Sequence, residues 1–185
     1  MSPSMGFEPI GSEERWRGAI IGAGTSRYRY ADGAVVSRDT VWHPGAVGIL
    51  ALDDDHVWLT RQPREVAGLT ASLEIPAGKL DVPGESPLGC ARRELAEEIA
   101  KVADDWRELH GFYTSVGYSD ERIWLFLARG LRDSPADGDG PDEDERIEIV
   151  PWPLREIEAA IAESEDAKTL IALQWLALER AAGRI

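Results

Sequence analysis

The sequence predicts an α+β fold, with a small antiparallel β-sheet at the start of the chain and a larger domain behind it. Two observations lead to this class: short β-type runs broken by turn signals occupy residues 16–42, and apolar strands alternate with helical patterns from residue 46 onwards. With 185 residues, the chain is long enough for one domain and an appendage. We therefore expect three parts: a flexible N-terminus over 1–14, a β-sheet over 15–43 and the main domain over 44–185.

Turn residues delimit the N-terminal sheet. Residues 1–14 are rich in Ser, Pro, Gly and Glu, which favours a flexible lead-in. Asp32-Gly33 separates two β-type runs, and both residues tolerate the positive φ angle of a tight hairpin turn. This pattern predicts an antiparallel sheet.

The main domain combines strands and helices. Apolar runs at 46–52 and 56–62 are joined by Asp53-Asp54-Asp55, which predicts a second hairpin. Further strands are expected over 72–75, 107–115, 122–129 and 146–150. Residues 133–145 predict a loop, because a run so rich in acidic residues, Gly and Pro cannot build a core.

Capping residues place three helices. They are expected over 87–103, 154–162 and 166–182. Ser86 followed by Pro87 is typical of a helix start, since a hydroxyl caps the helix and proline suits its first position. Asp166 is the expected N-cap of the last helix, and Gly183 is expected to end it.

The charge of the chain limits its partners. It has 34 acidic and 20 basic residues, a net charge of −14. This excess argues against general nucleic-acid binding, which needs a basic face, and against docking on anionic membranes. The single cysteine excludes an intramolecular disulfide, the first residues lack a signal-peptide pattern, and no apolar run approaches the roughly 20 residues that cross a bilayer. We therefore expect a cytoplasmic protein.

The helix predicted over 87–103 has two chemically different faces. Its apolar stripe consists of Leu88, Leu95, Ile99 and Val102. Its acidic face consists of Glu94, Glu97 and Glu98. An acidic face is most often solvated surface, but like charges at this spacing repel by about 0.2–0.5 kcal/mol per pair. A divalent cation would remove the repulsion, and oxygen ligands select Mg²⁺ or Mn²⁺ over Zn²⁺.

The residues around this helix resemble the signature of the Nudix hydrolases. Gly78 opens the pattern, Glu85 is its spaced glutamate, and Arg93-Glu94-Leu95-Ala96-Glu97-Glu98 forms its core. Three positions depart from it: six residues instead of five separate Gly78 from Glu85, Ala100 replaces a glycine and Lys101 replaces an aliphatic residue. The resemblance implies an α/β/α sandwich with a mixed central sheet.

Outside the signature, the chain is similar to the ADP-ribose pyrophosphatase subfamily from about residue 13 to 178. The matching stretches are WHPGAVGILAL at 42–52, RQPRE at 61–65, LEIPAGKLD at 73–81 and TSVGYSDERIWLFLARGL at 114–131. The resemblance implies Mg²⁺-dependent hydrolysis of ADP-ribose to AMP and ribose 5-phosphate by a metal-activated water, with Mn²⁺ as a substitute. It also implies a homodimer through the N-terminal sheet. Two alternatives stay open: hydrolysis of another nucleoside diphosphate sugar, and a non-hydrolysing ADP-ribose sensor.

The resemblance also implies roles for individual residues. The backbone carbonyl of Ala77 and the side chains of Glu94, Glu98 and Glu97 would hold the metal, while Arg93 would orient the glutamates. Glu143 is the first choice for the general base, and Glu145 is the second choice or a further ligand. The residues expected to bind substrate are Arg64, Arg61, Trp16, Tyr118 and Glu121.

Overall fold

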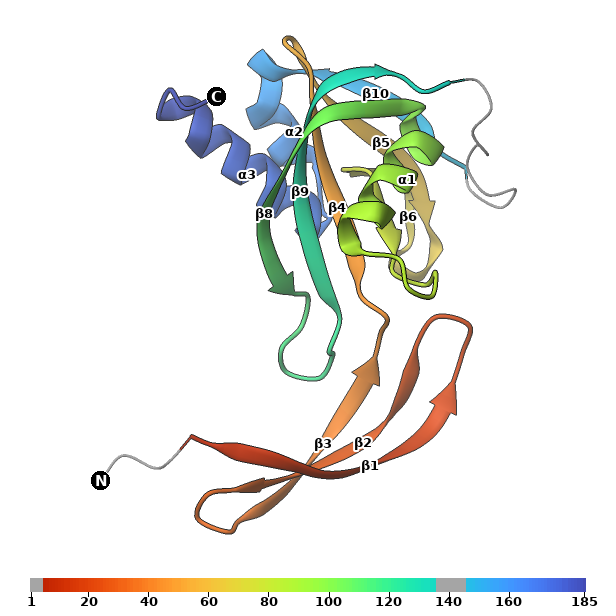
Figure 1. Cartoon of the computed structure of the whole chain (residues 1–185), viewed down its shortest axis with the longest axis vertical. Coiled ribbons are helices and arrows are strands. Elements are labelled where there is room, and N and C mark those ends of the chain that lie inside the picture. The colour runs from red at the N-terminus through yellow and green to blue at the C-terminus, as the bar shows by residue number, and fades with distance from the viewer. Residues whose placement is uncertain (1–4, 136–145) are drawn as a thin grey trace. The chain divides into compact units, whose positions relative to one another are not determined.

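A computed structural model describes residues 5–135 and 146–185 (Figure 1). The chain divides into two compact units. One consists of Met1–Gly45 with Phe112–Arg122, and the other of Ala46–Gly111 with Ile123–Ile185. No helix in the described residues is long and apolar enough to span a membrane.

The first unit contains an antiparallel three-stranded sheet. Its strands are β1 (Phe7–Arg17), β2 (Gly22–Tyr30) and β3 (Val35–Trp42), in that order across the sheet. The turn at Asp32-Gly33 is the predicted one: Gly33 has a φ of 88°, and the Asp32 carboxylate accepts a 2.9 Å hydrogen bond from the Ala34 amide.

The prediction of a flexible lead-in over residues 1–14 is wrong for residues 7–14, which belong to β1. The side chains of β1 are almost all exposed, so the strand shows no alternation of buried and exposed residues that would reveal it. The strand is held by antiparallel backbone pairing with β2, in which Phe7 lies opposite Tyr30 and Arg17 opposite Gly22. Backbone pairing of this kind leaves little trace in the sequence.

The segment Phe112–Arg122 completes the first unit, although it is distant in sequence from the three strands. The amide of Val41 donates to the carbonyl of Tyr118 at 2.7 Å, and the amide of Asp120 donates to the carbonyl of Val41 at 3.2 Å. The amide of His43 donates to the Asp120 carboxylate at 2.8 Å. These bonds attach the 112–122 segment to the end of β3.

The second unit is built on a mixed seven-stranded sheet. Its strands are β4 (Ala46–Leu52), β5 (His56–Arg64), β6 (Leu69–Glu74), β7 (Ala77–Lys79), β8 (Lys101–Tyr113), β9 (Arg122–Asp133) and β10 (Glu148–Pro153). The order is β10-β5-β4-β9-β8, with β6 on β5 and β7 on β4. The sheet is mixed because β4 runs parallel to β9 and antiparallel to β5 and β7.

Helices pack on this sheet. They are α1 (Pro87–Ile99), α2 (Ile157–Glu163) and α3 (Ala167–Ala181), with short 3₁₀ turns η1 (Glu65–Ala67) and η2 (Leu154–Glu156). In β4, Val47, Ile49 and Ala51 belong to the core cluster that includes the buried apolar residues of α1. Alternate side chains of a strand point to opposite faces, so Leu50 and Leu52 face away from α1. Figure 1 shows α1 and α3 on different sides of β4.

Helix α1 ends at Ile99, four residues earlier than the expected end at 103, and β8 begins at Lys101. The chain turns at Ala100, which has a left-handed conformation with φ 53° and ψ 38°. The periodicity of Val102 with the helix is therefore a coincidence of spacing. Ala100 occupies the position where the family signature has glycine, so a residue with a Cβ atom adopts the left-handed conformation that glycine accepts without strain.

Candidate active site

Helix α1 brings the signature glutamates to the sheet. Its start is fixed by Ser86, whose hydroxyl accepts a 3.0 Å hydrogen bond from the Gly89 amide, and by Pro87 at the first position. Leu95 and Ile99 are buried in the core. Burial of this apolar face sets the rotation of the helix, and thereby the direction of the acidic face.

Arg93 gathers three carboxylates around its guanidinium group. It donates to Glu85 at 3.1 and 3.2 Å, to Glu94 at 2.7 Å and to Glu97 at 2.8 Å. Its pKa is raised, first by the hydrogen bond with Glu85 and against the effect of burial, and further by the charge of Glu94. Arg93 therefore stays charged and offsets the repulsion among the glutamates.

The turn that carries Ala77 packs directly against these glutamates. The Glu98 carboxylate, in a residue only 5% exposed, accepts a 3.0 Å hydrogen bond from the Ala77 amide. A Cβ atom at Gly78 would collide with the carboxylate of Glu94. The absence of a side chain at Gly78 is thus what allows Glu94 to lie against the backbone of β7.

These residues fit a hard divalent cation in their chemistry. Glu94, Glu97 and Glu98 offer carboxylate oxygens, and the carbonyl of Ala77 belongs to the turn they contact, a donor set suited to Mg²⁺ or Mn²⁺. Within the described residues, no three acidic, histidine or cysteine side chains already converge as ligands do. Arg93 lies among the carboxylates instead, so cation binding would exchange some of its contacts for metal contacts.

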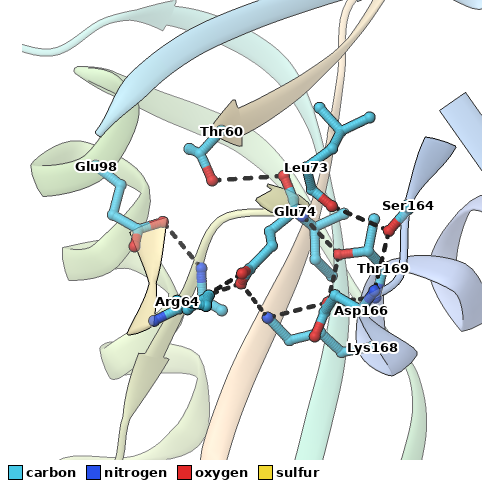
Figure 2. A network of polar contacts seen from close by, with 11 residues as sticks. Thr60, Arg64, Leu73, Glu74, Glu98, Ser164, Asp166, Lys168 and Thr169 are labelled. Carbon is cyan, nitrogen blue, oxygen red and sulfur yellow. Dashed lines mark hydrogen bonds and ion pairs between the residues drawn. The ribbon is translucent and has the colours of Figure 1, made fainter. Parts of the chain in front are cut away.

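The five residues Leu73–Ala77 are each held by a different partner. The Leu73 carbonyl accepts from Ser164 Oγ at 3.0 Å, and the Ile75 amide donates to Thr169 Oγ1 at 2.8 Å. The Pro76 carbonyl accepts from the Ile49 amide at 2.8 Å. The remaining two, Glu74 and Ala77, are held through their contacts with side chains of the network in Figure 2. The turn before β7 is therefore rigidly placed.

Glu74 is the centre of that network. Its two carboxylate oxygens accept from Nε and Nη2 of Arg64, both at 2.7 Å, and one also accepts from Nζ of Lys168 at 2.6 Å (Figure 2). Burial raises the pKa of Glu74, but the hydrogen bond from Arg64 and the charge of Lys168 outweigh it and lower the pKa to about 2. Lys168 also contacts Asp166 at 3.0 Å.

Sequence reasoning assigned no site role to Glu74 or Lys168. Two signals could have revealed them. Glu74 interrupts an apolar strand, and a buried carboxylate there requires a cationic partner. Lys168 lies in the first turn of α3, where the helix dipole disfavours a positive charge unless an acidic group compensates it.

The two arginines expected to bind substrate have different surroundings. Arg64 is held by Glu74, and its pKa is raised by the hydrogen bond with Glu74, against burial, and by further charges that include Glu98. Arg61 instead forms an ion pair with Glu163 of α2. The structure thus brings Arg64 near the acidic face of α1, whereas it engages Arg61 on the α2 side.

The other expected substrate-binding residues belong to the first unit. Trp16 and Tyr118 both line a hollow of about 410 Å³ in that unit, and the Trp16 ring lies against Gly18. Glu121 accepts a 2.7 Å hydrogen bond from Thr114 Oγ1 and lies 3.8 Å from Nε2 of His43. The two expected base residues, Glu143 and Glu145, lie outside the described residues.

The site combines carboxylates of α1 that can hold a hard cation with Arg64, which is fixed at the end of β5. This combination is typical of sites that bind phosphate groups. Comparison with known proteins identifies the family. The NUDIX domain profile matches residues 42–176. The chain therefore belongs to the Nudix hydrolase family, which confirms the family, the fold class and the enzyme class that the signature predicts.

Relatives of known name are similar over much of the chain. An ADP-ribose pyrophosphatase of Mycobacterium tuberculosis is 41% identical over 69% of this chain and 61% of its own length. A methanol dehydrogenase activator of Bacillus methanolicus is 35% identical over 93% of both chains, and an ADP-ribose pyrophosphatase of Bacillus subtilis is 35% identical over 96% of both. A solved ADP compounds hydrolase superposes with a TM-score of 0.79 over 97% of both chains at 24% identity, which supports the fold.

Proposed function

We propose that this protein hydrolyses ADP-ribose at its diphosphate, consuming one water and releasing AMP and ribose 5-phosphate, in a reaction that requires Mg²⁺ or, as a substitute, Mn²⁺. The observation that carries the proposal is the packing of α1 on the Ala77 turn, where Gly78 makes room for Glu94 and Glu98 binds the Ala77 amide. Two relatives named ADP-ribose pyrophosphatases support the choice of substrate.

The proposed ligands of the cation are Glu94, Glu97, Glu98 and the Ala77 carbonyl. When bound, a divalent cation would neutralise charge on the diphosphate and lower the pKa of an attacking water. Before the cation binds, Arg93 keeps these carboxylates oriented through its ion pairs with Glu94 and Glu97. We propose Glu143 as the general base, with Glu145 as the second choice.

The residues proposed to bind substrate are those that the sequence predicts. In the second unit, Arg64 would contact the diphosphate, and Arg61 would do so only after leaving Glu163. In the first unit, Trp16 is proposed to stack on the adenine, with Tyr118 and Glu121 as further contacts. A homodimer through the N-terminal sheet and a cytoplasmic location remain predictions from the sequence.

The decisive experiment compares wild type with Glu98→Gln in an assay of AMP release with and without Mg²⁺. We expect the variant to lose about 100-fold or more of kcat, because a neutral amide is a poor ligand for a hard cation. Glu158→Gln on α2 is the matched control, since Glu158 is exposed and has no proposed role. Unchanged turnover in Glu98→Gln would refute the metal assignment.

A substrate panel separates the alternatives. ADP-ribose should give the highest kcat/KM among nucleoside diphosphate sugars, and mass analysis should detect AMP and ribose 5-phosphate as products. A higher kcat/KM for a GDP- or UDP-sugar would replace the substrate but keep the reaction. Binding of ADP-ribose, seen as a raised melting temperature, without turnover of any substrate would instead indicate a sensor.

A further inference from the structure

The pair formed by Glu74 and Arg64 is an unusual arrangement for a strand end. The side chain of Glu74 is only 2% exposed, whereas that of Arg64 is 44% exposed. A buried carboxylate is costly unless cations compensate it, and here two do so, Arg64 from β5 and Lys168 from α3. The half-exposed arginine is therefore anchored from inside the protein.

The Glu74 carboxylate binds one edge of the Arg64 guanidinium group. Glu74 accepts from Nε and Nη2, each at 2.7 Å, so the pair uses one edge of the fork and leaves Nη1 as the atom that it does not engage. Arg64 also borders a hollow of about 610 Å³ in the second unit. An arginine without this anchor would lose more rotamer entropy on binding the same ligand.

Lys168 stabilises the anchor from the start of α3. Its Nζ lies 2.6 Å from Glu74 Oε2 and 3.0 Å from Asp166 Oδ2, and Asp166 is the N-cap that accepts from the Thr169 amide. Lys168 thus adds a second cation beside Glu74, and Asp166 balances its charge. The first turn of α3 therefore helps to set the position of the Glu74 carboxylate that holds Arg64.

The same turn of α3 also fixes the chain on its way to Ala77. Thr169 Oγ1 accepts from the Ile75 amide at 2.8 Å, one residue after Glu74. Arg64, which would bind the diphosphate, and the Ala77 carbonyl, which would bind the cation, are therefore positioned by the same set of contacts (Figure 2).

We infer that Glu74 is a positioning residue, which with Lys168 holds Arg64 so that its Nη1 edge meets the diphosphate of the substrate. This inference rests on the proposed function, since it concerns the same substrate. It assigns to a buried strand residue and to the start of α3 a role in substrate affinity, in addition to the stability that they contribute.

The test measures affinity separately from turnover in wild type, Glu74→Gln, Arg64→Ala and the double variant. Calorimetric titration with ADP, without metal, gives the Kd for a diphosphate, and hydrolysis of ADP-ribose with Mg²⁺ gives KM and kcat. We expect Glu74→Gln to raise Kd and KM by about tenfold and to change kcat by less than about twofold. In the Arg64→Ala background, the same substitution should not raise Kd further, because its effect acts through Arg64.

Glu179→Gln is the matched control. Glu179 accepts from Nε and Nη2 of Arg184 at 2.9 and 2.6 Å, the same fork geometry, at the end of α3. It should leave Kd and KM unchanged. If Glu74→Gln does not fold, Glu74→Asp keeps a carboxylate for Lys168 but is one methylene too short for the fork, and it should raise Kd by a similar factor.

The outcomes distinguish this inference from the proposed function. Wild type that binds ADP but hydrolyses nothing refutes the proposed function, while the ratio of Kd values still tests the role of Glu74. Equal increases in Kd from Glu74→Gln in both backgrounds, or no increase at all, would overturn the inference and leave a structural role only. It would also be overturned if wild type bound no ADP.

Discussion

Because Ala100 has a left-handed backbone conformation, we predict that Ala100→Gly raises the free energy of unfolding. Within residues 5–135 and 146–185, Ala100 is the one residue other than glycine with a positive φ angle. This conformation costs a residue with a Cβ atom about 1–2 kcal/mol. Glycine avoids that cost but loses about 0.4–1 kcal/mol more conformational entropy on folding.

The difference between these two terms predicts a gain of about 1 kcal/mol in the free energy of unfolding. Ala100 is exposed, so removal of its methyl group sacrifices little packing. Its amide bonds to the carbonyls of Ala96 and Leu95 are backbone contacts, which glycine keeps. For a chain of this length, the gain corresponds to a rise in Tm of about 2–4 °C.

Urea unfolding followed by circular dichroism measures this change. Ala159→Gly is the control, because Ala159 is an exposed residue inside α2, where glycine should cost about 0.5–1 kcal/mol. The two substitutions make the same chemical change and should shift the free energy of unfolding in opposite directions. A loss of stability in Ala100→Gly comparable to that in the control would refute the argument from backbone strain.

Three further predictions follow from other contacts. The pKa of Glu74 is about 2 in the folded protein, against an ordinary value of 4.5. Its ionised carboxylate therefore contributes about 3 kcal/mol to the free energy of unfolding above pH 4.5, and this contribution is lost as the pH falls towards 2. Unfolding curves at pH 3 and 6 should show a smaller difference in stability between wild type and Glu74→Gln at the lower pH. Gly78→Ala should displace the Glu94 carboxylate and raise the Mg²⁺ concentration for half-maximal activity by about tenfold or more, with an unchanged circular dichroism spectrum; an unchanged Mg²⁺ requirement would contradict the proposed role of this contact. Asp53→Ala should lower the free energy of unfolding by about 1–3 kcal/mol, measured by chemical denaturation. The substitution removes the acceptor of the 2.7 Å hydrogen bond from the Trp58 indole and the bonds that close the β4–β5 turn. A loss near zero would show that these bonds make no net contribution to stability.

Local signals in the sequence predicted much of this structure. The turn at Asp32-Gly33 and the helix start at Ser86 depend on residues within a few positions of one another, so their effects can be read directly from the chain. The same holds for the acidic face of α1, since helical periodicity alone places Glu94, Glu97 and Glu98 together.

Other features could not be predicted because they depend on partners far away in sequence. The strand β1 is stabilised by backbone pairing with β2 and has almost no buried side chains, so its residues look like a loop. The end of α1 is not predictable from the sequence, because an alanine adopts the left-handed C-terminal conformation that a glycine would have indicated.

Residue types and regular local geometry are thus enough to predict the signature helix, its charge and its preference for a hard divalent cation. The surroundings of that helix depend instead on tertiary packing. It placed Gly78 against Glu94 and brought Lys168 to Glu74 across 94 positions of the chain. A buried charge is stable only where the fold supplies its counter-charge, and that is a property of packing rather than of any local pattern.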